Sequence, residues 1–331
     1  MTKKSGKNTD ILQDAHGRII NYLRISVTDR CDLRCTYCMP AEGVPQLNHS
    51  EILRFEEIEA VVRVGAELGI KNARITGGEP LTRAGITSLI QKLSVIPGLK
   101  DLSITTNGVL FSKMGFPLRE AGLRRVNFGI SSLNSDIYYK LTRSSRLPEA
   151  LEGLEAAIKL GFEPIKLNVV VIRGINEDLS DFITLVKEKP VHVRFIEYMR
   201  IGAADYSSSF VPASEIRRQI GAAVELEPLN APVGCGPIQN AWRVSGGQGS
   251  IAIIAPVTEH VCEYCNRLRL TADGHLRPCL FSADEIDIKP ALRPAFNTEM
   301  LKSLFVEATQ KKPGNLRETT DFGRSMSQIG G

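Results

Sequence analysis

The sequence has no strong excess of charge, because 41 Lys and Arg residues are balanced by 37 Asp and Glu residues, which leaves a formal net charge of +4. This balance argues against a general nucleic-acid-binding protein, although it suits a site for a small polyanion. No apolar stretch approaches the length of a membrane span, and residues 251–255 (IAIIA) instead predict a buried strand. Residues 1–10 are polar and lack the apolar run of a signal peptide. We therefore expect a cytoplasmic protein with no membrane or nucleic-acid partner.

A disulfide framework is not expected either. The seven cysteines form two tight groups and a singleton, Cys235, in a chain of 331 residues. Disulfide scaffolds are typical of small secreted chains, which this sequence does not resemble. Clustered cysteines in a cytosolic protein indicate bound metal instead.

The chain is rich enough in apolar residues, at 43%, for a sizeable packed core. Between residues 20 and 198, short β-rich runs alternate with amphipathic helical patterns, such as Ile86, Leu89, Ile90 and Leu93 on one helix face. Six such repeats predict a parallel sheet, either barrel-like or doubly wound, with the chemistry at the C-terminal ends of the strands. The predicted strands are Tyr22–Val27, Ala73–Thr76, Leu102–Thr105, Arg125–Ile130, Ile165–Val171 and Val191–Glu197.

The pattern changes after about residue 200, where Gly and Pro become frequent and the β/α alternation fades. We therefore divide the chain into a polar tail (1–16), a β/α domain (17–235) and a smaller C-terminal domain (236–331). The last of these is expected to hold a few strands, the second cysteine group and a terminal helix.

The first cysteine group, Cys31, Cys35 and Cys38 in TDRCDLRCTYCMP, directly follows the first predicted strand. Three thiolates on one short loop can hold three irons of a [4Fe–4S] cluster, and the missing fourth cysteine leaves one iron open to a substrate. A structural zinc loop or buried thiols are the alternatives, and the C-x3-C-x2-C spacing disfavours them.

A glycine-rich loop, ITGGEPL at residues 75–81, ends the next predicted strand. Gly77 and Gly78 would let the main chain approach a ligand closely, and Glu79 can accept hydrogen bonds from an ammonium group. Alone this would be an ordinary turn, but it lies one β/α unit after the three cysteines. The combination resembles the radical S-adenosylmethionine superfamily. That resemblance implies that Cys31, Cys35 and Cys38 hold a [4Fe–4S] cluster, with Tyr37 beside the adenine and Gly78 at the methionine end of S-adenosylmethionine.

The second group comprises Cys262, Cys265 and Cys279, again without a fourth cysteine nearby. By spacing alone it could hold a second cluster or, with His260 or His275, a zinc ion in a Cys3His site. Arg267 and Arg269 flank this group, and they could be either solvated surface charges or bidentate contacts to phosphate.

Several motifs together resemble the GTP 3′,8-cyclase family of molybdenum-cofactor biosynthesis, from about Gly17 to Gly331. These are DAHGRIINYLRISVTDRC, RITGGEPL, RFIEYM, CNRLRLTADG and the final Gly330–Gly331 pair. The resemblance implies an incomplete (β/α)6 TIM-type barrel closed by a smaller C-terminal α+β domain, and two [4Fe–4S] clusters, the second bound by Cys262, Cys265 and Cys279. It implies conversion of GTP to (8S)-3′,8-cyclo-7,8-dihydroguanosine 5′-triphosphate, with GTP and an electron donor such as flavodoxin or ferredoxin as partners. A homodimer is left open.

Site residues follow from the matching positions. The resemblance implies that Glu79, Gly129 and Met199 contact S-adenosylmethionine and that the terminal Gly330 and Gly331 enter the active site. For GTP the implied contacts are Arg24, Arg74, Thr105, Lys166, Arg267, Leu268 and Arg269.

Three positions depart from the family pattern. Gly129 and Ser131 replace the usual Ser and Asp, and Asp32 replaces the usual Asn after the first cysteine. The serine that contacts S-adenosylmethionine in the family is therefore replaced by Gly129 here, whereas every cluster cysteine is kept.

Overall fold

The protein is described by a computed structural model that covers residues 11–199, 208–229, 240–259, 261–315 and 324–330. Twelve strands form one sheet in the order β12-β11-β10-β1-β2-β3-β4-β5-β6-β9-β8-β7. In this order, every neighbouring pair between β10 and β9 is parallel. The pairs at the two ends of the sheet, β12-β11, β11-β10, β9-β8 and β8-β7, are antiparallel. The parallel strands are β1 (Tyr22–Ser26), β2 (Asn72–Thr76), β3 (Asp101–Thr106), β4 (Arg125–Gly129), β5 (Ile165–Val171), β6 (Val191–Glu197), β9 (Ser250–Ile254) and β10 (Arg267–Leu270).

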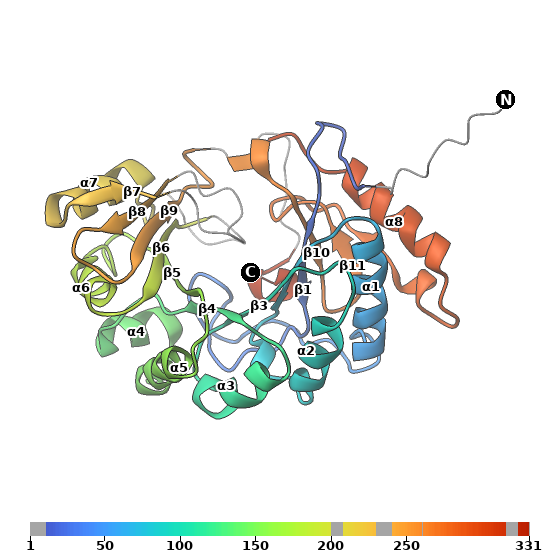
Figure 1. Ribbon diagram of the computed structural model, residues 1–331, viewed down its shortest axis with the longest axis horizontal. Helices are drawn as coiled ribbons and strands as arrows, with labels where there is room; N and C mark the ends of the chain where they lie inside the picture. The colour runs from blue at the N-terminus through green and yellow to red at the C-terminus, as the bar shows by residue number, and fades with distance from the viewer. Residues whose placement is uncertain (1–10, 200–207, 230–239, 260, 316–323, 331) are drawn as a thin grey trace.

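The sheet curves around an interior, and the helices lie outside it in an arc (Figure 1). Its antiparallel edges are formed by β11 (His275–Arg277) and β12 (Ile286–Asp287) at one end and by β7 (Leu226–Pro228) and β8 (Asn240–Val244) at the other. The helices are α1 (Phe55–Glu67), α2 (Ile86–Ser94), α3 (Phe111–Glu120), α4 (Ser135–Thr142), α5 (Leu147–Lys159), α6 (Ser180–Glu188), α7 (Ala213–Ala223), α8 (Thr298–Gln310) and the short α9 (Met326–Ile329).

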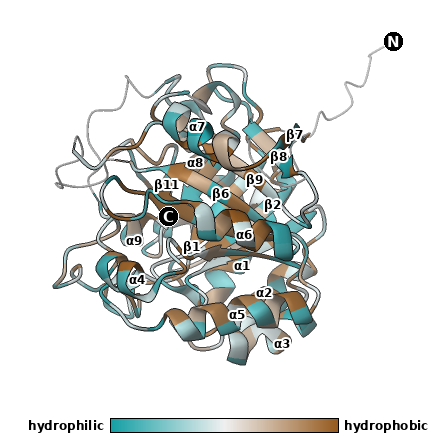
Figure 2. Ribbon diagram, turned by 90° about the vertical axis from the view of Figure 1, so that its left-hand side faces the viewer, coloured by the Kyte–Doolittle hydropathy of each residue, from teal (hydrophilic) through white to brown (hydrophobic). Residues whose placement is uncertain are grey.

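The outer helices form where the sequence places apolar residues on one face. In α2 the buried residues are Ile86, Leu89, Ile90 and Leu93, the face that the spacing predicts. Burying each of these side chains contributes about 1.5–3 kcal/mol, so the face alone accounts for why this segment packs as a helix on the sheet. Figure 2 shows the resulting mixture of hydrophobic and hydrophilic segments on α2, α3 and α5.

The predicted α/β class and parallel arrangement are confirmed, and all six predicted strands lie within about a residue of β1–β6. The predicted strand at residues 251–255 is β9, and the predicted terminal helix is α8. Among the described residues, no helix is long and apolar enough to cross a membrane.

The C-terminal part of the chain extends both sides of the sheet. Strand β9 pairs with β6, and β10 pairs with β1, so segments after residue 236 flank the six β/α repeats. The predicted boundary at residue 235 lies outside the described residues. Closure of a (β/α)6 barrel by a separate C-terminal domain therefore stays a prediction.

Candidate active site

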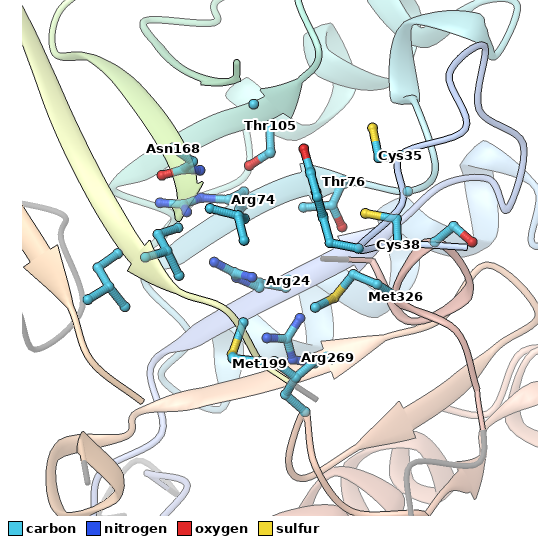
Figure 3. A pocket seen from close by; sticks show the side chains of 18 of the residues that line it. Arg24, Cys35, Cys38, Arg74, Thr76, Thr105, Asn168, Met199, Arg269 and Met326 are labelled. Atoms are coloured by element: carbon cyan, nitrogen blue, oxygen red, sulfur yellow. The ribbon is translucent and has the colours of Figure 1, made fainter. Parts of the chain in front are cut away.

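A cavity of about 330 Å³ lies inside the curved sheet, at the C-terminal ends of β1–β6. Both cysteine groups line it, although they are more than 200 residues apart in the chain. All six of these cysteines are free thiols. Figure 3 shows arginines at the centre of this cavity, with Arg24 between Arg74 and Arg269.

The first cysteine loop leaves the end of β1 and is held by the Arg34 side chain within the loop and by α4. Arg34 Nη1 donates to the Cys31 carbonyl at 2.7 Å, and the Thr36 amide donates to the Leu141 carbonyl at 2.8 Å. Burial raises the pKa of Cys31 to about 12. The pKa of Cys35 is lowered, first by a hydrogen bond from Cys38, so the two thiols behave as a pair. The loop thus presents three thiols to one cavity, and this donor set fits an iron–sulfur cluster.

Gly77 and Gly78 line the cavity and also contact the main chain just before the cysteine loop, a second role that the sequence did not predict; the contact of Gly78 with S-adenosylmethionine stays a prediction. The Gly78 amide donates to the Thr28 carbonyl at 2.7 Å, and the Glu79 amide donates to the Arg30 carbonyl at the same distance. A Cβ on Gly78 would lie 2.3 Å from the Arg30 carbonyl oxygen. The glycines are therefore needed for close approach of two main-chain segments, and this contact orders the residues just before Cys31.

Glu79 lies at the cavity but already has partners within the protein. Its carboxylate is buried and accepts hydrogen bonds from the Leu81 amide (3.0 Å), Thr106 Oγ1 (2.8 Å) and the Asn107 amide (2.7 Å). Burial raises its pKa to about 7. The carboxylate therefore fixes the turn after β3, and its predicted contact with S-adenosylmethionine stays a prediction.

The two unusual residues near the end of β4 have clear local surroundings. A Cβ at Gly129 would lie 3.8 Å from the nearest atom, the Thr106 carbonyl oxygen, which is an ordinary van der Waals contact. The Ser131 hydroxyl lies 3.2 Å from the Tyr37 hydroxyl and accepts a hydrogen bond from the Val170 amide. Gly129, Ser131 and Tyr37 all line the cavity.

Arginines from three neighbouring strands form a cationic wall. Arg24 on β1 pairs in register with Arg74 on β2 and with Arg269 on β10, and adjacent strands lie only about 4.8 Å apart. The Tyr22 ring lies against the guanidinium groups of Arg74 (5.4 Å) and Arg267 (5.9 Å). Burial lowers the pKa of Arg24 well below its usual value, and the neighbouring arginines lower it further. Burial likewise lowers the pKa of Arg269 to about 10.

Such crowding of cations is unfavourable without a compensating anion. Several polar atoms that line the cavity also have no hydrogen-bond partner among the described residues, namely Arg24 Nε, Arg267 Nε, Thr105 Oγ1 and Asn168 Oδ1. Both observations indicate a site for a polar, anionic ligand.

Two of the predicted GTP contacts are not brought to the cavity wall. The Leu268 side chain is fully buried in the hydrophobic core, because residues on a strand alternate between its faces and Arg267 and Arg269 occupy the inner one. Lys166 is buried on β5, on the same face as Asn168 and Val170, but only the latter two line the cavity. Lys166 therefore lies on the inner face of β5 but outside the cavity lining, and its contact with GTP stays a prediction.

The cavity also contains residues that the sequence did not single out. Arg194 lines it from β6, Asn168 from β5 and Lys312 from the segment after α8. Arg194 Nη2 donates to Asn127 Oδ1 at 2.8 Å. Alternation along β5 and β6 could have suggested the first two, whereas nothing in the local sequence marks Lys312.

Within the second cysteine group, Cys262 lies on η2 (Val261–Tyr264), Cys265 directly follows η2, and Cys279 comes two residues after β11. Burial raises the pKa of Cys265, but the positive charges of Lys312 and Arg267 outweigh this and bring it to about 7. His275 is not placed to complete a Cys3His zinc site, because it contacts Asp273 (3.3 Å) and Arg324 (3.5 Å) and does not line the cavity. No three His, Cys, Asp or Glu side chains in the described ranges are arranged to hold a single metal ion. His260 lies outside those ranges.

The C-terminal helix α9 reaches into the cavity, where Met326 and Ser327 line it. Arg269 Nη1 donates to the Gly330 carbonyl at 2.8 Å, and Figure 1 places this end of the chain at the centre of the molecule. Gly330 adopts a φ of +81°, and a Cβ there would lie 2.5 Å from Thr76 Oγ1. Gly331 lies outside the described residues.

Comparison with known proteins defines the class of this architecture. Residues 25–186 match the Radical SAM superfamily, and residues 191–317 match the family Molybdenum Cofactor Synthesis C. The crystal structure of Streptococcus suis SuiB bound to S-adenosylmethionine shares the fold, with a TM-score of 0.60 at 16% identity, over 82% of this chain and 64% of SuiB. The chain is thus a radical S-adenosylmethionine protein, a class that implies a [4Fe–4S] cluster and S-adenosylmethionine as cofactors.

Curated relatives narrow the class further. GTP 3′,8-cyclase of Moorella thermoacetica is 47% identical over 324 residues, which cover 97% of this chain and 100% of the relative. GTP 3′,8-cyclase of Pelotomaculum thermopropionicum is 47% identical over 326 residues, with the same coverage. The chain belongs to the GTP 3′,8-cyclase family.

Proposed function

We propose that this chain catalyses the radical cyclisation of GTP to (8S)-3′,8-cyclo-7,8-dihydroguanosine 5′-triphosphate, the first step of molybdenum-cofactor biosynthesis. The observation that carries the proposal is the single cavity that combines two cysteine groups with arginines from three adjacent strands. Thiols are the protein ligands of iron–sulfur clusters, and guanidinium groups suit phosphate, so both requirements of the reaction meet in one place.

The cationic wall would bind the triphosphate. Arg24, Arg74, Arg267 and Arg269 lie on adjacent strands, so their charges can be offset together by one polyanion. Thr105 would add a hydrogen bond from its hydroxyl, which has no partner in the described part of the chain. Lys166 would act from outside the cavity lining, through its charge.

The first cysteine loop would hold the cluster that binds S-adenosylmethionine. When bound, this pair supplies a 5′-deoxyadenosyl radical, while the protein positions the substrate and excludes water. Tyr37, Gly78, Glu79, Gly129 and Met199 all line the same cavity, and we assign these five residues to S-adenosylmethionine.

The second cysteine group would hold a second [4Fe–4S] cluster, with an open iron toward the guanine ring. In support, Cys262, Cys265 and Cys279 come from two separate segments yet face one cavity, together with Arg267 and Arg269. The Gly330–Gly331 tail would complete the site, because Gly330 already contacts Arg269. We further assign an electron donor such as flavodoxin or ferredoxin and a cytoplasmic location; a homodimer stays a prediction.

The test is an anaerobic turnover assay with GTP, S-adenosylmethionine and dithionite on the reconstituted full chain, with products identified by mass spectrometry. We expect 5′-deoxyadenosine and the cyclised nucleotide in parallel, no cyclised product with ATP, and about eight irons with little zinc per chain. Radical formation without any cyclised nucleotide from GTP would refute the assignment of substrate.

A further inference from the structure

Lys312 is a buried lysine whose side chain joins two of the segments that carry the second cysteine group. It is only 3% exposed. Its ammonium donates to the Arg267 carbonyl at 2.8 Å and to the Pro278 carbonyl at 2.7 Å, and it also hydrogen-bonds to the Cys265 thiol. Arg267 follows Cys265 by two residues, and Pro278 directly precedes Cys279. One ammonium group therefore fixes the main chain beside two of the three cysteines.

Arg18 fixes the third. Its Nη1 donates to the Cys262 carbonyl at 2.7 Å, and its Nη2 donates to the Pro313 carbonyl at 2.7 Å. Pro313 is the neighbour of Lys312, so the two cations are linked through the chain. Arg18 is itself held by Asp14, whose carboxylate lies 2.5 Å from Arg18 Nε. Together, Arg18 and Lys312 set the spacing of Cys262, Cys265 and Cys279.

The two cations differ in how their charge is balanced. Arg18 has the fully buried Asp14 carboxylate. No ion pair among the residues that the structure describes involves Lys312; its partners there are two carbonyls and a thiol. A buried ammonium is costly unless a negative charge compensates it. Among the described residues, the group in contact with Lys312 that can carry such a charge is the cysteine site.

We propose that Lys312 is a positioning residue for the second cysteine group and that its ammonium is the buried counter-charge of an anionic iron–sulfur cluster bound there. The inference rests on the proposed second cluster. A positive charge and an N–H···S hydrogen bond beside a cluster favour its reduced, more negative state. Lys312 should therefore raise the reduction potential of this cluster as well as hold its ligands in place.

The test needs the second cluster alone. Replacing Cys31, Cys35 and Cys38 by alanine leaves the second group as the source of any cluster signal, and this background is expected to bind about four irons after anaerobic reconstitution. Lys312→Met is then compared with Lys312→Arg, which keeps the charge, by redox titration followed with electron paramagnetic resonance.

We expect Lys312→Met to shift the reduced-to-oxidised ratio at least tenfold toward the oxidised state, which is about 59 mV for a one-electron couple, and to lose iron faster to a chelator. Lys312→Arg should keep most of the parent potential. Lys311→Met is the matched control, because Lys311 is the exposed neighbour and pairs with Glu307 on the surface. This control should leave both readings at the parent value.

The outcomes separate the two hypotheses. A background protein without a cluster would overturn the proposed second cluster, and this inference with it. A cluster whose potential and iron retention are unchanged in Lys312→Met would overturn the inference alone. If circular dichroism shows that Lys312→Met does not fold, Lys312→Gln replaces it in the comparison. The glutamine amide is uncharged but can still donate a hydrogen bond to a carbonyl. An unchanged reduction potential in Lys312→Gln would equally refute the role of Lys312.

Discussion

Replacing Gly330 with alanine should remove the C-terminal tail from the cavity without unfolding the protein. Gly330 has a φ of +81°, a conformation that costs an L-residue about 1–2 kcal/mol. The new methyl group would also lie 2.5 Å from Thr76 Oγ1 and 2.9 Å from Ser26 Cβ. Thr76 cannot easily turn away, because its hydroxyl donates to the Ile25 carbonyl. Overpacking of this kind costs about 1–3 kcal/mol.

The two costs sum to about 2–5 kcal/mol, which corresponds to a loss of about 30-fold to a few thousand-fold in the docked tail. The tail lies at the end of the chain, so it can undock and relieve the strain locally. We therefore expect cyclised product to fall with the docked fraction, while the iron content, S-adenosylmethionine binding and melting temperature stay near the parent values. Deleting residues 330–331 or adding a C-terminal tag should have the same result.

The assay measures cyclised nucleotide and 5′-deoxyadenosine together under anaerobic conditions, and carboxypeptidase digestion reports whether the tail is docked. Gly246→Ala is a matched control: its φ is +70° and no atom lies within 4 Å of its added Cβ, so it carries the conformational cost alone, in the β8–β9 turn. If Gly330→Ala cyclises GTP at the parent rate with a protease-resistant tail, the reasoning from the left-handed conformation and the close approach is wrong.

Four further substitutions test the cavity. Cys35→Ala should abolish production of 5′-deoxyadenosine, because the first loop has only three cysteines, while GTP binding measured by equilibrium dialysis should persist; formation at the parent rate would contradict this role. Cys265→Ala should stop cyclisation of GTP, while cleavage of S-adenosylmethionine continues without it. Finding one tightly bound zinc in the parent protein, in place of a second iron–sulfur cluster, would refute this role of Cys265. Arg267→Ala and Arg269→Ala should each weaken GTP binding about 10- to 100-fold, the value of a charge-assisted contact of about 1.5–3 kcal/mol, with little change in melting temperature. Unchanged affinity in both variants would refute their assignment to GTP.

The repeating core of this protein could be predicted from its sequence. Alternating and helical periodicities are local properties, so β1–β6 and the buried face of α2 were predicted within about a residue. The cysteine spacings are local as well, and they indicated two metal-binding groups before any tertiary contact was known. Conversely, the local pattern after residue 200 was weak, and it did not predict which strands β9 and β10 would join.

The tertiary structure decided the site. Parallel pairing of β10 with β1 joins segments about 245 residues apart, and only this register places Arg269 beside Arg24 while it buries Leu268 in the core. The same long-range packing shows that Gly78 is required by a neighbouring main-chain segment, and it brings Lys312 between the arms of the second cysteine group. Local sequence encodes periodicity and turn chemistry, but a contact between distant segments depends on how the whole sheet curves and closes its core, so these roles emerge only when the chain is folded.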